Sequence, residues 1–108
     1  MKKENFWITL ARWNGAEDLD FKEVTGYTEE FCDEDGRVVK IGVYRRDKEW
    51  IATEISTGSA ISGLHGKTRN EVFNRITAEL IHNVLIALER NRNMKYASAK
   101  LHEFVSMQ

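Results

Sequence analysis

The spacing of apolar residues changes once along this chain, from strand-like alternation in the first half to a helical repeat in the second. Phe6 to Trp13 alternates and is rich in aromatic and β-branched residues, which is typical of a strand. From Val72 onward, apolar residues recur every three or four positions, as they do on one face of a helix. Strands that precede helices, rather than alternate with them, predict an α+β fold with an antiparallel sheet.

Three further strands are expected between residues 25 and 56, at 26–32, 37–45 and 50–55. Asp35-Gly36 is a hairpin signal between the first two of them. Residues 16–24 fit either a loop or a helical turn, and 57–67 form a glycine- and serine-rich segment that we expect to be a loop. The sequence therefore predicts a sheet of about four strands, with these residues on the face toward the helix: Phe6, Ile8, Leu10, Val39, Ile41, Val43, Ile51 and Ile55.

The helical repeat begins with a capping motif. Thr68-Arg69-Asn70-Glu71 fits a capping box, in which the Thr and Glu side chains accept from backbone amides at the helix start. The apolar stripe continues to Leu88, so we expect one long helix that ends near Glu89–Asn91 and spans about 33 Å. A second repeat, from Met94 to Val105, predicts a C-terminal helix. The 108 residues are the size of a single domain, 1–108.

Cysteine content and hydropathy bear on location. Cys32 is the one cysteine of the chain, which suits a reducing compartment. The first residues lack the apolar run of a signal peptide, and no stretch is long and apolar enough to cross a membrane. We therefore expect a cytoplasmic protein without membrane contact.

The charge is unevenly distributed. Residues 1–36 hold ten acidic and four basic residues, whereas residues 37–108 hold seven acidic and twelve basic ones. An acidic face can occupy a basic groove that normally holds a nucleic-acid backbone. The alternative is a solvated surface that aids solubility. The candidate partner-binding residues are Glu17, Asp18, Asp20, Glu29, Glu30, Asp33, Glu34 and Asp35.

Aromatic residues suggest a second candidate surface. If Phe6 and Ile8 face the helix, other aromatic side chains point to the opposite sheet face, where they would form a stacking platform for single-stranded nucleic acid or a protein-binding patch. The alternative is that the last helix covers this face as a second core layer. The residues concerned are Trp7, Trp13, Tyr44 and Trp50.

The segment 56–68 raises the alternative of a small enzyme. It combines Ser and Thr hydroxyls with His65, but no nucleophile-elbow pattern accompanies them. Gly66-Lys67-Thr68 is not a phosphate-binding P-loop, because that motif needs glycine at the position of Ile61. The three histidines and Cys32 show no metal-ligand spacing. We therefore expect neither catalysis nor a metal or cofactor.

The order of three strands and a helix over residues 37–90, through Lys67-Thr68-Arg69-Asn70-Glu71, resembles HicB-type antitoxins and double-stranded-RNA-binding domains. In its size, lone Cys32 and acidic segment 17–35, the chain is similar to anti-CRISPR inhibitors of phages and plasmids. The second resemblance implies an inhibitor that binds a nuclease complex through acidic surfaces.

The sequence thus predicts a non-catalytic inhibitor or adaptor whose acidic face occupies a basic site on a nucleic-acid-processing protein. The alternatives are a nucleic-acid-binding or HicB-antitoxin-like module that uses the aromatic face, and a small enzyme that uses residues 56–68. The expected length of the helix also leaves a homodimer open.

Overall fold

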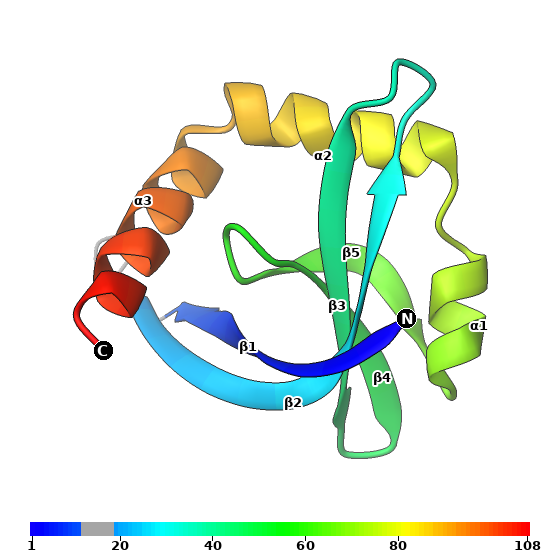
Figure 1. The fold of residues 1–108 in the computed structure, drawn as a ribbon, viewed down its shortest axis with the longest axis horizontal. Helices are drawn as coiled ribbons and strands as arrows, with labels where there is room; N and C mark the ends of the chain where they lie inside the picture. Colours follow the sequence, from blue (N-terminus) through cyan, green and yellow to red (C-terminus); the bar gives the residue numbers. More distant parts are fainter. Residues whose placement is uncertain (12–18) are drawn as a thin grey trace.

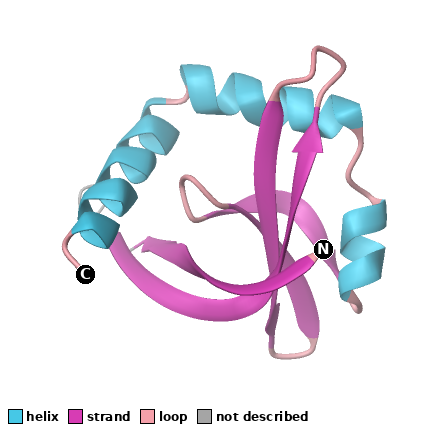
Figure 2. Ribbon diagram, viewed as in Figure 1, coloured by secondary structure: helices cyan, strands magenta, loops and turns pink. Residues whose placement is uncertain are grey.

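Five antiparallel strands, joined in sequence order, form one sheet, and three helices follow it along the chain (Figures 1 and 2). This computed structural model describes residues 1–11 and 19–108. The strands are β1 (Lys2–Ala11), β2 (Leu19–Cys32), β3 (Val38–Arg46), β4 (Glu49–Glu54) and β5 (Ser59–Gly66). The helices are α1 (Arg69–Asn74), α2 (Ala78–Arg90) and α3 (Arg92–Ser106). The α+β class expected from the sequence is confirmed.

The sheet has five strands rather than about four, because the segment expected as a loop forms β5. Its ends pair with β4 at Glu54↔Ser59 and Trp50↔Gly66, and the register shifts between them. Gly63, in the irregular part, has a φ of 75°, which glycine adopts without strain. Small polar residues and a bulge leave no alternation of the kind that predicts a strand.

The single long helix is also corrected, because residues 75–77 separate α1 from α2. Thr68 caps α1 by accepting from the amide of Glu71 at 3.1 Å, as the capping motif predicts. Thr77 caps α2 in the same way, accepting from the amide of Leu80 at 3.1 Å. Each cap satisfies an amide that lacks a partner within its helix.

The apolar residues expected on one sheet face lie on two. Tyr44 pairs with Ile51, and Val43 with Ala52, because only Asp47 and Lys48 separate the paired ends of β3 and β4. Cross-strand partners share a face of the sheet. This register therefore places Ile51 on the same face as Tyr44, and Val43 on the other face.

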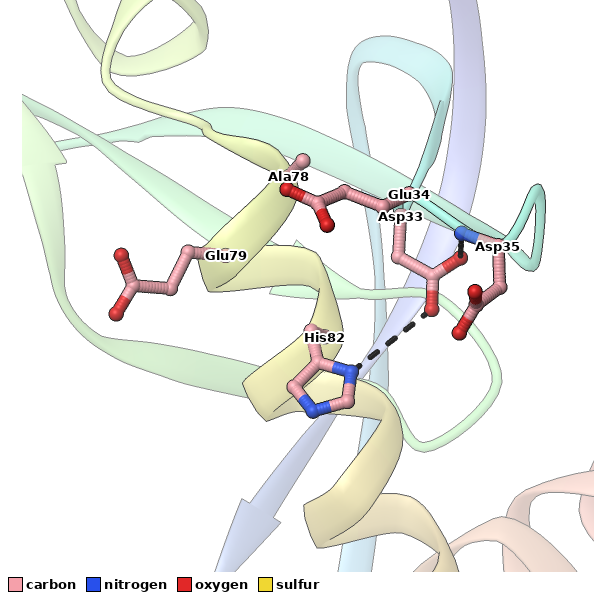
Figure 3. Close-up of a pocket in the computed structure, with 6 residues that line it drawn as sticks. All are labelled: Asp33, Glu34, Asp35, Ala78, Glu79 and His82. Carbon is pink, nitrogen blue, oxygen red and sulfur yellow. Dashed lines mark hydrogen bonds and ion pairs between the residues drawn. The ribbon is translucent and has the colours of Figure 1, made fainter.

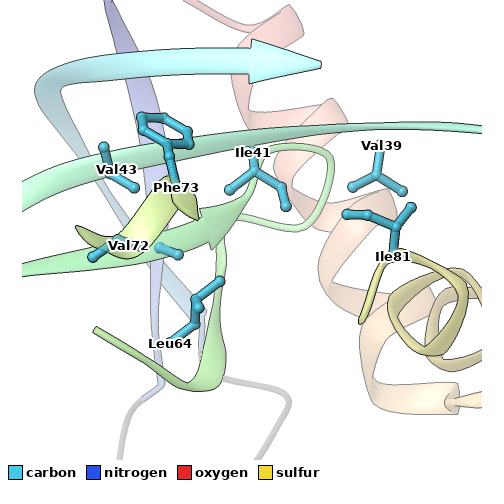
Figure 4. Close-up of a cluster of buried hydrophobic side chains, with 8 residues drawn as sticks. Val39, Ile41, Val43, Leu64, Val72, Phe73 and Ile81 are labelled. Atoms are coloured by element: carbon cyan, nitrogen blue, oxygen red, sulfur yellow. The ribbon is translucent and has the colours of Figure 1, made fainter. Parts of the chain in front are cut away.

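The first core, shown in Figure 4, lies between the strands β3–β5 and the helices α1 and α2; its fully or nearly fully buried members include Val39, Ile41, Val43, Leu64, Val72, Phe73 and Ile81. The second core, on the other side of the strands, joins Phe6, Ile8 and Tyr44 with the half-buried Val24, Ile51 and Ile55. Leu10, expected in the core, is 42% exposed.

The β4–β5 turn touches the first strand and curls the sheet. Thr9 donates its amide to the Gly58 carbonyl at 2.8 Å and its hydroxyl to the Thr57 carbonyl at 2.6 Å. The turn is held by the buried carboxylate of Glu54, which accepts from the amides of Ser56 and Thr57, both at 2.9 Å. We call this contact the β1 clasp (Thr9, Thr57 and Gly58).

Two further contacts place the helices. Arg75, which follows α1, donates to the carbonyls of His65 at 2.8 Å and Gly63 at 3.2 Å along β5. Phe104 of α3 lies 5.0 Å from the Trp7 ring and 4.9 Å from the Phe21 ring, measured between centroids. None of the helices in the described ranges has the length and apolar character needed to cross a membrane.

Candidate functional site

Acidic side chains gather where the β2–β3 turn meets α2. Asp33, Glu34 and Asp35 belong to this turn, and Gly36 closes it with a φ of 80° and a hydrogen bond from its amide to the Asp33 carbonyl at 3.1 Å. Across from them lies Glu79, in the first turn of α2. We call these four carboxylates the acidic corner (Asp33, Glu34, Asp35 and Glu79).

Asp33 holds the turn in place. Its side chain is 1% exposed and accepts from the amides of Asp35 at 3.0 Å and Arg37 at 2.9 Å. The Arg37 Nε donates to the second oxygen at 3.0 Å. Burial opposes ionisation of Asp33, but the hydrogen bonds from the Arg37 amide and guanidinium outweigh it and lower the pKa of this carboxyl.

Arg37 also ties the turn to α2. Its Nη1 lies 3.0 Å from the Glu89 carboxylate, and its Nη2 lies 3.4 Å from the Nδ1 of His82. The nearby Asp33 carboxylate is 4.0 Å from that same His82 nitrogen. One guanidinium therefore contacts two carboxylates. The hydrogen bond that lowers the pKa of Asp33 also raises the pKa of Arg37.

The acidic corner surrounds a hollow of about 310 Å³ (Figure 3). Ala78 and His82 of α2 complete its lining. Glu34, Asp35 and Glu79 are exposed, whereas the Arg37 charge is already shared by Asp33 and Glu89. The corner is therefore net negative and directs three exposed carboxylates toward solvent. In the described part of the chain, no group of three or more His, Cys, Asp or Glu residues is arranged to hold a metal ion.

The structure brings together only some of the acids that the sequence singles out. Glu17 and Asp18 lie outside the described residues. Glu29 lies 3.4 Å from the Met1 amino group, and Glu30 lies across from Lys40 on β3. Sequence reasoning missed Glu79, because it joins the acidic corner only through the packing of α2 against the turn. Its position on an amphipathic helix, three residues before His82, does not indicate that it lies near the turn.

The four aromatic candidates do not form one platform. Trp7 packs against Phe104 of α3. Tyr44 is 7% exposed and lies in the second core, 6.2 Å from the Phe6 ring. Trp50 lies 6.1 Å from the Tyr27 ring, beside the first core. The register of the β3–β4 hairpin separates Tyr44 from Trp50, and Trp13 lies outside the described residues.

The hydroxyl residues of segment 56–68 do not converge on His65. Ser56 and Thr57 direct their hydroxyls to the Glu54 carboxylate, with Thr57 at 2.9 Å. His65 lies toward the other end of β5, opposite Ile51, and its Nδ1 is 3.2 Å from the Glu49 carboxylate. Because β5 is extended between them, these groups do not form a nucleophile–base pair.

Comparison with known proteins found no matching family model, no similar curated sequence and no similar solved structure.

Proposed function

We propose that this protein is a non-catalytic inhibitor or adaptor, and that its acidic corner occupies a basic, nucleic-acid-binding site on a partner protein. The observation that carries the proposal is the bonding of Asp33, which fixes the turn and leaves Glu34 and Asp35 exposed beside Glu79. A turn whose backbone is held in place loses little conformational freedom on binding, which favours affinity.

The chemistry of the partner follows from the charge. Lysine and arginine side chains that hold phosphates attract carboxylates by the same electrostatic force, and that force weakens with salt. The corner offers acids from a turn and from a helix, so its charges are spread over a surface rather than along one strand. This arrangement suits a protein groove lined by several basic residues.

The setting we propose is the bacterial cytoplasm, where anti-CRISPR inhibitors and related accessory proteins act. Cys32 is exposed and forms no disulfide, which is compatible with a reducing compartment. The alternative of a nucleic-acid-binding module finds less support, because Tyr44 is buried in the second core and Trp7 packs against Phe104 of α3.

The proposal is tested by capture of the tagged protein from bacterial lysate, with and without nuclease, followed by binding measurements on the recovered partner. We expect a stoichiometric protein partner that survives nuclease, and competition by heparin, a polyanion that binds basic grooves. The double variant E34K/D35K should weaken binding by at least about tenfold, because it reverses two charges at the interface.

The matched control is E103K, which reverses an exposed acid on α3, away from the corner. It should bind as the wild type does. Equal binding by E34K/D35K and the wild type would contradict the proposal, as would recovery that depends on nucleic acid.

A further inference from the structure

A second hollow lies between the first strand and the last helix. Its lining includes Phe6 and Trp7 of β1, Lys40 of β3, and Ser98, Leu101 and His102 of α3. We call it the β1–α3 groove. We propose that this groove binds an acidic peptide in an extended conformation, which adds a strand to the outer edge of β1. The inference is independent of the acidic corner.

The backbone of β1 offers free hydrogen-bonding groups along the groove. The amide of Thr9 points away from β2, because it donates to Gly58. The register between β1 and β2 runs without a shift from Lys2 to Ala11, and peptide groups of alternate residues in an antiparallel pair point the same way. Lys3, Asn5 and Trp7 therefore present their peptide groups at the outer edge, as Thr9 does.

The edge is open over a limited length. The β1 clasp occupies it at Thr9, and Gly58 also lies close to the Trp7 carbonyl, where an added Cβ would be 3.1 Å from the oxygen. An added strand can therefore pair only with the part of β1 that precedes this carbonyl. In the described chain, no backbone hydrogen bond from another element reaches Asn5 or Trp7 on this side. An unpaired edge beside a helix is the geometry that domains use to recognise peptides by strand addition.

The walls of the groove suit alternate side chains of such a peptide. Its volume is about 380 Å³, within the range of roughly 300–1,000 Å³ for binding pockets. Phe6 and Leu101 are buried at its base, and Val105 of α3 is 44% exposed at its rim. An extended peptide that pairs with β1 would direct every second side chain toward this apolar surface.

The charges of Glu4 and Lys40 offset each other within the groove, and an ammonium beside it that is free in the described chain favours an acidic peptide. The one carboxylate of the groove, Glu4, already accepts from Thr28 and lies 2.7 Å from the Lys40 ammonium. These hydrogen bonds lower the pKa of Glu4 and keep it ionised in the neutral range. An adjoining hollow shares Ser56, Ser98 and His102 with the groove and adds Lys95. Neither the Lys95 ammonium nor the His102 ring meets a carboxylate in the described chain, so an incoming anion has two partners.

The test uses a displayed library of random linear peptides, selected on the full chain. We expect the selected peptides to combine acidic residues with alternating apolar ones and to bind less tightly as salt is raised. Asn5→Pro should weaken their binding by at least about tenfold, because it removes an outward amide that β2 does not use. Asn5→Ala is the matched control: both variants lose the side-chain contact to Thr25, but alanine keeps the amide.

A second pair of variants tests the groove from the helix. Ser98→Trp should fill the groove and abolish peptide binding, whereas Lys100→Trp, which lies outside it, should leave binding unchanged. Circular dichroism verifies the fold of each variant. The proposal is overturned if no peptide is selected, or if the selected peptides bind Asn5→Pro and Ser98→Trp as well as the wild type. It is also overturned if the wild-type chain dimerises in light scattering and Asn5→Pro does not, because the occupant is then a second copy.

Discussion

Asp33 and Arg37 connect the acidic corner to the rest of the molecule. The sequence predicts Asp33 in an acidic turn with an Asp-Gly hairpin signal, and Arg37 at the start of the strand that follows. The sequence does not reveal that Asp33 is buried whereas its neighbours Glu34 and Asp35 are exposed. That distinction depends on the approach of α2, which shields Asp33 and supplies Glu89 to the other side of Arg37.

The lowered pKa of Asp33 predicts a pH dependence of stability. A carboxyl whose pKa is lower in the folded state stabilises the fold above its unfolded pKa, whose ordinary value is 3.8, and this contribution is lost as pH falls through the folded value. Asp33→Asn should therefore flatten the acid limb of a plot of urea midpoint against pH. Glu34→Gln, at an exposed neighbouring position, should leave that limb unchanged; the same flattening in both variants would contradict the assignment.

Arg37→Ala should destabilise the protein, since it leaves a buried carboxylate without its cation. The urea midpoint at neutral pH should fall, and the amide of Asp35 should exchange faster with solvent as the turn loosens. Arg45→Ala is the control, because Arg45 is exposed and, among the described residues, its side chain donates only to the carbonyl of Asp47. An unchanged midpoint for Arg37→Ala would show that Arg37 does not hold the turn.

At the level of elements, local patterns predicted most of the sheet and the cap of the first helix. The meander of β3, β4 and the second half of β2, and the capping of α1 by Thr68, follow from alternation, turn residues and a short motif. The first half of β2 does not, because residues 19–24 were expected as a loop or a helical turn. The break between α1 and α2 was not predicted, because the apolar residues on either side of it keep a helical spacing and both helices pack on the same core. Thr77 carried the missed signal, since threonine is a common cap.

Substitution of Thr77 tests this reading of the break. Thr77→Ala removes the acceptor for the Leu80 amide and should lower the free energy of unfolding by about 1 kcal/mol. Thr77→Ser keeps the hydroxyl and should stay close to the wild type. Chemical denaturation measures the free energy of unfolding of both variants. An equal loss of this free energy in the two variants would show that the methyl group of Thr77, and not its hydroxyl cap, is responsible.

The register of the β3–β4 hairpin explains the error in the candidate aromatic face. Alternation within each strand was assigned correctly, but the relative phase of two strands depends on the number of residues between their paired ends. Asp47, with a φ of 57°, accommodates a turn of only two residues. That geometry is not evident from the residues Asp47-Lys48, so Tyr44 and Trp50 could not be placed on their separate faces beforehand.

Across the whole molecule, the β1 clasp joins the first strand to the middle of the chain. Gly58 has a φ of 69°, and a Cβ there would lie 2.6 Å from the Thr9 hydroxyl. Gly36 has a φ of 80° and open space around it. Gly36→Ala should therefore cost about 1–2 kcal/mol of backbone strain, whereas Gly58→Ala adds a steric clash and should cost more.

Comparison of these two variants isolates the clasp. Both alanines carry the same conformational penalty, so the additional loss of unfolding free energy in Gly58→Ala measures the contact with β1. Hydrogen exchange of the Thr9 amide should accelerate in Gly58→Ala and remain slow in Gly36→Ala. Equal effects of the two substitutions would indicate that the clasp contributes nothing beyond the turn itself.

The guanidinium of Arg75 has a consequence for how this protein behaves at high concentration. Unpaired carbonyls along an edge strand are templates for cross-β aggregation, and β5 has few charged side chains to prevent it. Arg75 already donates to the carbonyls of Gly63 and His65, so these two acceptors are engaged within the chain. A single side chain contributed by the α1–α2 connection thus covers two acceptors of a glycine- and serine-rich edge that a strand of another chain would otherwise use.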